Sequence, residues 1–297
     1  MYRVLAGAAA VLAIVGGAAG ARAQGGLTPP PAGRETRRTV DPRPAVAAGR
    51  VVEYLVPSRT LGRDRRVWVY TPPGYAPEAR TAYDLLVAFD GGEYLDTIPL
   101  PMILDTLLAA GHAPPYVAVL IDDSTSQARL DDLANRASFA AFLGGELIPW
   151  VRSHWRVTRD PHRTIVTGSS AGGLAANYVA LRRPDLFGNV LSQSGALWRG
   201  NEASNDPPYE WLTGQYAAAP RRDVRFFLDV GALEIRGALR GAAPSIRDAN
   251  RRLRDVLRSK GYTIAYTEVA DGNHAPSFWT LRLPDGIVAL AGDTAGR

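Results

Sequence analysis

One short motif of this sequence has the residue types and spacing of an activated serine. Gly168-Ser169-Ser170-Ala171-Gly172 matches G-x-S-x-G, with a β-rich stretch before it and a helix-forming stretch, AGGLAANYVAL, after it. In that setting the serine occupies a sharp strand-to-helix turn that raises its hydroxyl above a sheet. We therefore expect a nucleophile at Ser170. A plain glycine-rich turn is the alternative, and Ser169 as nucleophile would need glycines at 167 and 171, where the chain has threonine and alanine.

A neutral serine is a weak nucleophile, and the chain offers four histidines that could act as its base. His112, His154 and His162 precede the serine and fit a connector, a helix end and a turn. His274 follows the last expected strand and precedes the closing helix. Because the acid and then the histidine follow the serine in hydrolases with this turn, His274 is the expected base.

The acid of such a site should lie between Ser170 and His274, just beyond the carboxyl end of a strand. Residues 226–231 (FFLDVG) are that strand, and Glu234 follows three residues later. Asp229 is the competitor, but inside the strand its side chain would point sideways or into the sheet. Glu234 is therefore preferred as the group that holds the imidazole tautomer and stabilises the imidazolium, with Asp229 left open.

Two backbone N–H groups are needed to stabilise the oxyanion that forms during acyl transfer. The first is expected from Ala171, immediately after the nucleophile and at the start of a helix, where the dipole also favours negative charge. The second is expected from the turn Asp90-Gly91-Gly92, which follows the apolar run YDLLVAF. Glycines there let the backbone approach the substrate, and Gly92 is the expected donor.

The segments around these residues alternate between apolar runs of strand length and helical patterns. Strands are expected at 51–56, 65–70, 83–89, 116–121, 164–167, 190–192, 225–230 and 262–269. Helices are expected at 101–110, 137–155, 172–181, 244–260 and 279–290, with Pro284 a candidate interruption. The first two strands are expected to form an antiparallel pair. Unbroken apolar strands between helices predict the α/β class: a mostly parallel sheet with helices on both faces.

The N-terminus has the pattern of a secretory signal peptide. Arg3 follows a short start, residues 4–19 are apolar, and Ala21-Arg22-Ala23 is a small-x-small cleavage site. A membrane anchor is the alternative, but the apolar stretch is short for a spanning helix. Residues 1–23 are therefore expected to be a signal peptide and 24–47 a flexible segment rich in Pro, Gly and Ala. Residues 48–297 are expected to form one catalytic domain, in a periplasmic or secreted protein.

Composition excludes several classes of function. The chain has no cysteine, so thiol nucleophiles, disulfides and thiolate metal ligands are excluded. The net charge of +5 is mild and no basic face interleaved with aromatics is present, which argues against nucleic acid as a partner. Lys260 is the only lysine and residue 257 is leucine, so a Ser-x-x-Lys enzyme is excluded. No H-E-x-x-H motif is present, and no metal or other cofactor is expected.

Several segments together resemble one known family. They are the turn Asp90-Gly91, IDDSTSQARLDDLA, GELIPWVRSHWRV, the run from Gly168 through LAANYVALRRPDLFGNVLSQSGALW, and GNHAPSFWTLRLPDGIVAL. Across residues 65–290 they resemble the esterase family that includes the enterochelin (enterobactin) esterases, esterase D and the mycobacterial mycolyltransferases. The enterochelin-esterase branch is the most similar, and it implies the α/β-hydrolase fold.

The resemblance implies a Ser170–His274 couple with Glu234 as the acid, and an oxyanion hole from Gly92 and Ala171. It further implies that three residues lie near the substrate pocket: Arg129, Asn135 and Trp198. Arg129 is expected to pair with an anionic or catecholate part of the substrate, with a surface salt bridge as the alternative. The implied reaction is hydrolysis of catecholate siderophore esters without a metal cofactor of the enzyme's own.

The chain is expected to depart from the cytoplasmic enterochelin esterases, because the pattern of a signal peptide stands where they have an N-terminal domain. It therefore resembles the shorter, exported siderophore esterases, and after signal cleavage no membrane partner is expected. Esters of a different kind remain open as substrates, including feruloyl and acetyl-xylan esters. The sequence also leaves open an acyltransferase and a non-catalytic binding protein on the hydrolase fold.

Overall fold

The structure is a computed structural model that describes residues 46–122, 125–201, 208–235 and 243–291. The chain divides into two units, Met1–Arg43 and Pro44–Arg297, and the description concerns the second. The expected signal peptide and nearly all of segment 24–47 lie outside the described residues. No helix in the described ranges is long and apolar enough to cross a membrane.

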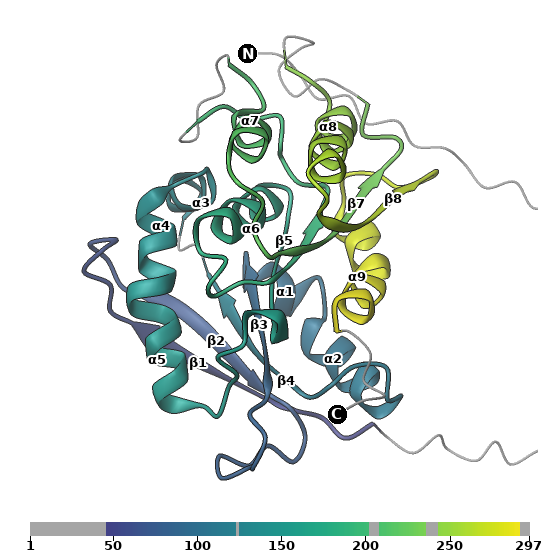
Figure 1. Cartoon of the computed structure of the whole chain (residues 1–297). Coiled ribbons are helices and arrows are strands. Elements are labelled where there is room, and N and C mark those ends of the chain that lie inside the picture. Colours follow the sequence, from purple (N-terminus) through teal and green to yellow (C-terminus); the bar gives the residue numbers. More distant parts are fainter. Residues whose placement is uncertain (1–45, 123–124, 202–207, 236–242, 292–297) are drawn as a thin grey trace, which may run out of the picture. The chain divides into compact units, whose positions relative to one another are not determined.

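A twisted sheet of eight strands runs through the described part of the chain (Figure 1). In chain order the strands are β1 (Arg50–Val56), β2 (Arg65–Thr71), β3 (Asp84–Phe89), β4 (Tyr116–Ile121), β5 (Thr164–Ser169), β6 (Asn189–Gln193), β7 (Arg225–Gly231) and β8 (Thr263–Val269). Their order in the sheet is β1-β2-β4-β3-β5-β6-β7-β8. Among the strand pairs of the described ranges, β1–β2 and β2–β4 are antiparallel and the rest are parallel, so the predicted antiparallel start and mostly parallel sheet are confirmed.

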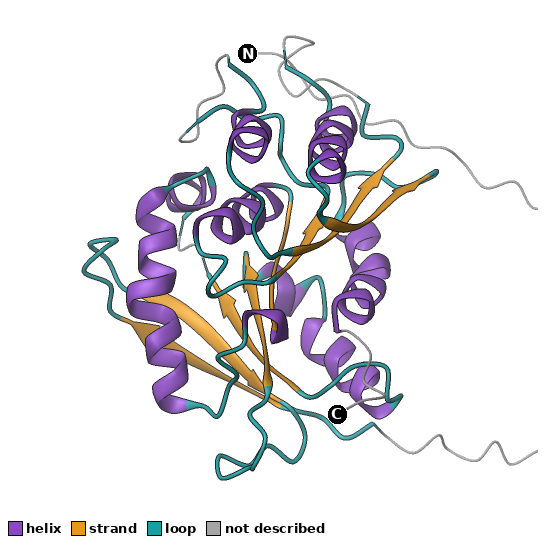
Figure 2. Cartoon of the chain, viewed as in Figure 1, coloured by secondary structure: helices purple, strands orange, loops and turns teal. Residues whose placement is uncertain are grey.

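Helices cover both faces of this sheet (Figure 2). They are α1 (Glu93–Asp96), α2 (Leu100–Ala109), α3 (Ser126–Leu133), α4 (Ala137–Phe142), α5 (Ile148–His154), α6 (Ala171–Arg182), α7 (Trp211–Ala218), α8 (Ile246–Ser259) and α9 (Pro276–Ala291). Residues of α1, α2 and α9 share one apolar cluster, and residues of α3 to α8 share the other. The predicted α/β class, a mostly parallel sheet with helices on both faces, is thereby confirmed.

The central strands separate these two clusters by simple alternation. In β3, Leu85, Val87 and Phe89 belong to the cluster under α4 to α6, whereas Leu86 and Ala88 belong to the cluster under α2 and α9. Every residue of this strand is buried. Because both faces are covered, the strand has an unbroken apolar sequence instead of an alternating one.

Two helices differ from their predicted form. The helix expected at 137–155 is divided into α4 and α5 by a π-helical segment, Leu143–Leu147. Pro149 lies two residues after this segment and has no N–H to donate to the carbonyl four residues back, Gly145, which is consistent with the wider turn. Pro284, the candidate interruption, lies inside a continuous α9. The sequence analysis did not predict α1, α3 or α7.

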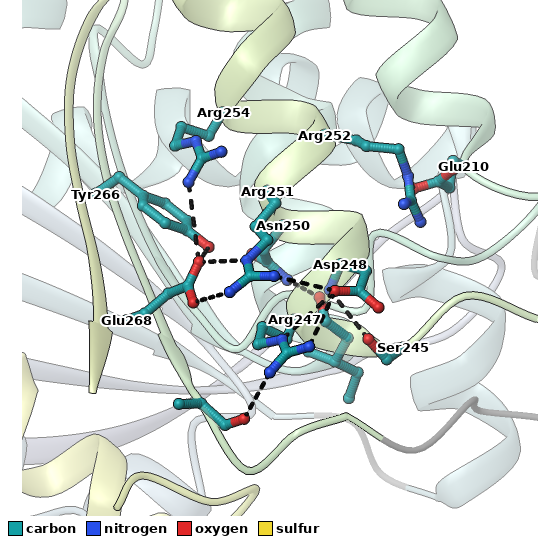
Figure 3. A network of polar contacts seen from close by, with 12 residues as sticks. Glu210, Ser245, Arg247, Asp248, Asn250, Arg251, Arg252, Arg254, Tyr266 and Glu268 are labelled. Carbon is teal, nitrogen blue, oxygen red and sulfur yellow. Dashed lines mark hydrogen bonds and ion pairs between the residues drawn. The ribbon is translucent and has the colours of Figure 1, made fainter. Parts of the chain in front are cut away.

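The helix α8 is tied to the edge strand β8 by charged groups (Figure 3). The guanidinium of Arg251 donates to both carboxylate oxygens of Glu268, over 2.7 and 2.6 Å, and the Tyr266 hydroxyl donates to the same carboxylate. The Arg247 guanidinium donates to the carbonyl of Ala232, in the loop after β7 (3.2 Å). These contacts hold α8 against the ends of β7 and β8, the two strands that precede Glu234 and His274.

Candidate active site

The candidate nucleophile lies where β5 gives way to α6. Ser170 has a φ of 53° and a ψ of −113°, a strained conformation for a residue with a side chain. Its N–H donates to the carbonyl of Gln193 over 2.9 Å. A Cβ at Gly168 would lie 2.5 Å from the backbone of Gly172, and one at Gly172 would lie 3.2 Å from the Asp90 carboxylate. The turn is therefore tight on both sides of the serine, as a nucleophile elbow requires.

The imidazole of His274 lies between the serine and a carboxylate. It comes from the loop after β8, with Nε2 3.0 Å from Ser170 Oγ and Nδ1 2.6 Å from Glu234 Oε2. When Nδ1 carries the proton and donates to Glu234, Nε2 is free to accept from the serine hydroxyl. The ring meets Trp279 edge to face, with 5.1 Å between centroids. The three sequence-predicted residues are thus brought together from three separate loops.

Glu234 is held in place by groups that the sequence analysis did not single out. Its Oε1 accepts from the Ser194 hydroxyl over 2.6 Å and from the Gly231 N–H over 2.8 Å. Ser194 in turn accepts from the indole N–H of Trp279 over 2.9 Å. The side chain of Glu234 is only 2% exposed. Both carboxylate oxygens therefore have partners, which fixes the direction in which Oε2 meets the histidine.

The competing acid, Asp229, makes different contacts. It is fully buried in β7, and its Oδ2 accepts from the Gln193 amide over 3.3 Å. No partner for Oδ1 is present in the described part of the chain. Burial, the largest influence, raises the pKa of Asp229 to about 7. Asp229 thus bonds to a residue of the neighbouring strand, as expected from its position inside β7. The carboxylate that contacts the histidine is that of Glu234.

Two backbone N–H groups near the serine match the expected oxyanion donors. Ala171 is the first residue of α6, and Gly92 caps the short helix α1. The neighbouring Gly91 N–H donates to the carbonyl of Ile121 over 2.7 Å, which fixes the loop against β4. For the N–H groups of Gly92 and Ala171, no acceptor is present among the described residues. Both are thus available to a substrate oxygen.

A cavity of about 220 Å³ opens beside Gly92. Its other lining residues carry charge: Asp90, Glu93, Asp122 and Arg129. A second cavity, of about 300 Å³, is lined by His274 and Glu234. It is otherwise lined by aliphatic side chains, Leu233 and Ile246. The site therefore borders one polar and one apolar space.

Arg129 makes the ion pair that the sequence analysis held as the alternative. Its Nε and Nη2 donate to the two carboxylate oxygens of Asp90, over 2.5 and 2.7 Å. Asp90 itself is in a left-handed conformation, with a φ of 58°, directly after β3. The guanidinium thus braces the turn that leads to Gly92 while it also lines the polar cavity, and its pairing with an anionic substrate remains a prediction.

Asn135 and Trp198 are both buried, and neither is among the lining residues of the two cavities. The Asn135 amide donates to the carbonyl of Gly200 over 3.1 Å. Trp198 packs in the core cluster, with the Arg199 guanidinium over its ring. These contacts give both residues a role in shaping the segment around residue 200. Substrate contact at Asn135 and Trp198 remains a prediction.

Glu93 was missed by the sequence analysis, because a glutamate after a Gly-Gly turn has no distinctive motif. It begins α1, lines the polar cavity, and accepts from the Ser169 hydroxyl over 2.9 Å. Burial, the largest influence, raises the pKa of the Glu93 carboxyl above its usual range. In the described ranges, no group of three or more His, Asp or Glu side chains is close enough to hold a metal ion.

Comparison with known proteins identifies the family. The profile of the family described as Putative esterase matches residues 58–290. The chain is 32% identical over 241 residues to the iron(III) enterobactin esterase of Escherichia coli strain K12. The aligned region covers 80% of this chain and 56% of that protein. It is 27% identical over 272 residues to the iron(III) salmochelin esterase of Escherichia coli O6:H1, covering 87% of this chain and 63% of that protein.

A solved structure gives the same picture. The enterobactin esterase of Shigella flexneri, crystallised in the presence of enterobactin, superposes with a TM-score of 0.69 at 30% identity. The match covers 81% of this chain and 59% of that one. The chain thus spans little more than half the length of these relatives. With the matched profile extending over most of its length, the chain belongs to the Putative esterase family and has the fold of the enterobactin esterases.

Proposed function

We propose that the protein is a serine carboxylic-ester hydrolase that works through an acyl-enzyme on Ser170. One observation carries this proposal: an unbroken chain of contacts from the serine hydroxyl through His274 to Glu234, over 3.0 and 2.6 Å. Such a couple, with the base oriented by a third group, is the arrangement that activates a serine. Membership of an esterase family supports the same reaction.

In the first half of the reaction, Nε2 of His274 takes the proton of Ser170 as Oγ attacks the ester carbonyl. The carbonyl oxygen becomes an oxyanion, for which the N–H groups of Ala171 and Gly92 are the available donors. Glu234 stabilises the imidazolium that has formed. The imidazolium then protonates the leaving alcohol, the C–O bond breaks, and the acyl group remains on the serine.

In the second half, water takes the place of the alcohol. His274 removes a proton from the water as it attacks the acyl-enzyme, and the same two N–H groups stabilise the second oxyanion. The imidazolium then protonates Ser170 Oγ as the bond between Oγ and the acyl carbon breaks, and the carboxylic acid is released. An alcohol in place of water would make the enzyme an acyltransferase, so the outcome depends on which acceptor reaches the acyl-enzyme.

For the natural substrate, we propose esters of catecholate siderophores of the enterobactin type. The proposal rests on the relatives, which are named iron(III) enterobactin and iron(III) salmochelin esterases and are 32% and 27% identical to this chain. In this chemistry the iron belongs to the substrate. We also propose that the reaction takes place after export, because residues 1–23 have the pattern of a signal peptide.

Measuring turnover of a panel of esters tests both the proposed reaction and the proposed substrate class. Purified protein is assayed on ferric and iron-free enterobactin-type triesters and on feruloyl, acetyl and short-chain acyl esters, with the Ser170→Ala variant beside it. The exposed Ser259→Ala is the matched serine control. The expected result is the highest kcat/KM on a triester, lost in Ser170→Ala and kept in Ser259→Ala. Faster cleavage of feruloyl or acetyl esters would overturn the substrate proposal, and equal turnover by Ser170→Ala would overturn the hydrolase itself.

A further inference from the structure

A second carboxyl group lies close to the site and has no part in the mechanism above. The hydroxyl of Ser169, which is fully buried, donates to Oε2 of Glu93 over 2.9 Å. His274, Asp90 and Arg129 are near enough to influence the pKa of this carboxyl. Neither member of the Glu93–Ser169 pair contacts the nucleophile through a hydrogen bond in the described structure. Their position in the chain indicates what the pair does.

Each member of the pair adjoins a segment with a candidate oxyanion donor. Glu93 directly follows Gly92, and Ser169 directly precedes Ser170, with Ala171 next. The two N–H groups that must converge on one oxygen therefore belong to different segments of the chain. Stabilisation of an oxyanion requires both donors within about 2.7–3.1 Å of that oxygen, so the separation of the two segments must be fixed.

The sheet itself does not fix that separation. The strands β3 and β5, which lead into the two segments, are paired from Leu85 with Thr164 to Ala88 with Thr167. The paired register ends there, before either donor is reached. Beyond it, the loop after β3 is held to β4 by the Gly91 N–H. Across this gap the Ser169 hydroxyl donates to Glu93 and so joins this loop to the residue before the nucleophile. The Asp90 carboxylate of the same loop also lies close to Gly172, just after the nucleophile.

We propose that Glu93 is a positioning residue for the oxyanion hole, which it sets by joining the Gly92 segment to the Ser170 turn through Ser169. The inference rests on the proposed hydrolase function and adds a residue to it. Its role needs an acceptor oxygen at the right place and does not need a negative charge. Glu93→Gln retains such an oxygen, whereas Glu93→Ala and Ser169→Ala each remove one side of the bond.

The test compares Glu93→Ala, Ser169→Ala, the double variant and Glu93→Gln. Since a misplacement of about 1 Å can cost about 100-fold in rate, each alanine variant should lose about 10- to 100-fold in kcat, with KM within about threefold. The double variant should be no worse than the poorer single variant, because both remove the same contact. Glu93→Gln should stay within about threefold of the wild type.

A matched control comes from another Ser–Glu pair in the same chain. Ser58 donates to Oε2 of Glu146 over 2.5 Å, and neither residue belongs to a segment of the site. Ser58→Ala should lower the melting temperature as Ser169→Ala does, while its kcat is unchanged. Thermal melts on all variants separate loss of folding from loss of alignment.

Comparing two inhibitors separates an effect on the oxyanion hole from an effect on substrate binding. A boronic acid, which forms a tetrahedral anion on the serine, should lose affinity in Glu93→Ala by the factor lost in kcat/KM, whereas an uncleavable amide analogue of the substrate should bind unchanged. The labelling rate of Ser170 by a fluorophosphonate gives the same readout without a known substrate. Additive losses in the double variant, an effect on KM alone, or Glu93→Gln as impaired as Glu93→Ala would overturn the inference.

Failure of the proposed function has a different signature. If wild-type protein labels or turns over at Ser170 and Glu93→Ala is equally active, only the role of Glu93 is refuted. If Ser170 neither labels nor is needed for turnover, the hydrolase proposal and this inference fall together.

Discussion

At the scale of single residues, the site is marked by strained backbone. Asp90, Ser170 and Ser194 all have left-handed φ values, of 58°, 53° and 47°. Asp90 leads to the candidate oxyanion donor Gly92, and Ser194 donates to Glu234. Non-glycine residues in this region cost about 1–3 kcal/mol each and persist only where the surroundings impose them. Asn135 and Glu210 are the other described non-glycine residues with a positive φ, so three of the five lie in turns that direct a side chain or an N–H group toward the site.

The choice of acid gives a prediction at this scale. Glu234→Gln should lower kcat on the order of 10³- to 10⁴-fold, because an amide that donates to Nδ1 imposes the wrong imidazole tautomer. The melting temperature should change far less, since the amide keeps the volume of the side chain. Asp229→Asn is the comparison, and it should keep kcat within about threefold, because its carboxyl bonds to Gln193 and not to the histidine. The reverse pattern of losses would identify Asp229 as the acid.

Asp229 should instead affect how the free energy of unfolding depends on pH. Its pKa is about 7 in the folded protein and near 3.8 in a solvated carboxyl, so between these values the folded state binds more protons than the unfolded state. Stability from this group therefore falls as the pH rises from about 4 to 7. Asp229→Asn should accordingly gain stability relative to the wild type between pH 5 and pH 8, measured by urea unfolding. A pH-independent difference between the two proteins would contradict the raised pKa.

At the scale of elements, the acid and histidine loops are packed backbone to backbone. A Cβ on Gly231 would lie 2.2 Å from the carbonyl oxygen of Gly272. Gly231 ends β7 three residues before Glu234, and Gly272 lies two residues before His274. The absence of a side chain at 231 therefore sets how closely the acid approaches the base.

Gly231→Ala should push the two loops apart and lower kcat by at least about tenfold, since near-attack geometry tolerates little displacement. Gly214→Ala is the matched control: it lies in α7, and nothing is within 4 Å of its added Cβ. It should leave kcat unchanged and raise stability by about 0.5–1 kcal/mol. Steady-state kinetics with thermal melts would check both, and an equal kcat for the two variants would refute the packing account.

Some of the strands and helices could be predicted from the sequence, and others could not. The strands β3 and β4 could be predicted because an unbroken apolar run of strand length is typical of a buried parallel strand, and α6 because it follows a nucleophile motif. The helices α1, α3 and α7 have only four, eight and eight residues, too few turns for a clear apolar period. Ser194, Trp279 and Glu93 act through contacts between distant segments, which spacing along the chain does not encode.

At the scale of the whole molecule, the sheet order explains why loops so distant in sequence meet. The strands β3, β5, β6, β7 and β8 are parallel neighbours, so their carboxyl ends share one edge. Gly92, Ser170, Ser194, Glu234 and His274 each follow one of these five strands in turn. In sheets of this kind, ligands bind at that edge. Class and site order could therefore be predicted from sequence, whereas the bracing of Asp90 by Arg129 could not.

The export proposal is tested on the whole chain. Expressed from Met1 in a Gram-negative host, the protein should be recovered from the periplasm with Gln24 as its first residue, as shown by N-terminal sequencing. Leu12→Arg, which places a charge in the apolar stretch, should leave the full-length chain in the cytoplasm. Recovery of the wild-type chain in the cytoplasm with Met1 or Tyr2 at its start would contradict export.

The central claim is a covalent bond between an acyl group and the oxygen of one serine. Its most direct measurement is intact-protein mass spectrometry of the protein quenched in acid during turnover of an ester, followed by peptide mapping. We predict one acyl adduct per chain, on Ser170, which accumulates when deacylation is slowed and is missing in Ser170→Ala. Turnover without any adduct, or an adduct on Ser169 or another side chain, would contradict the account.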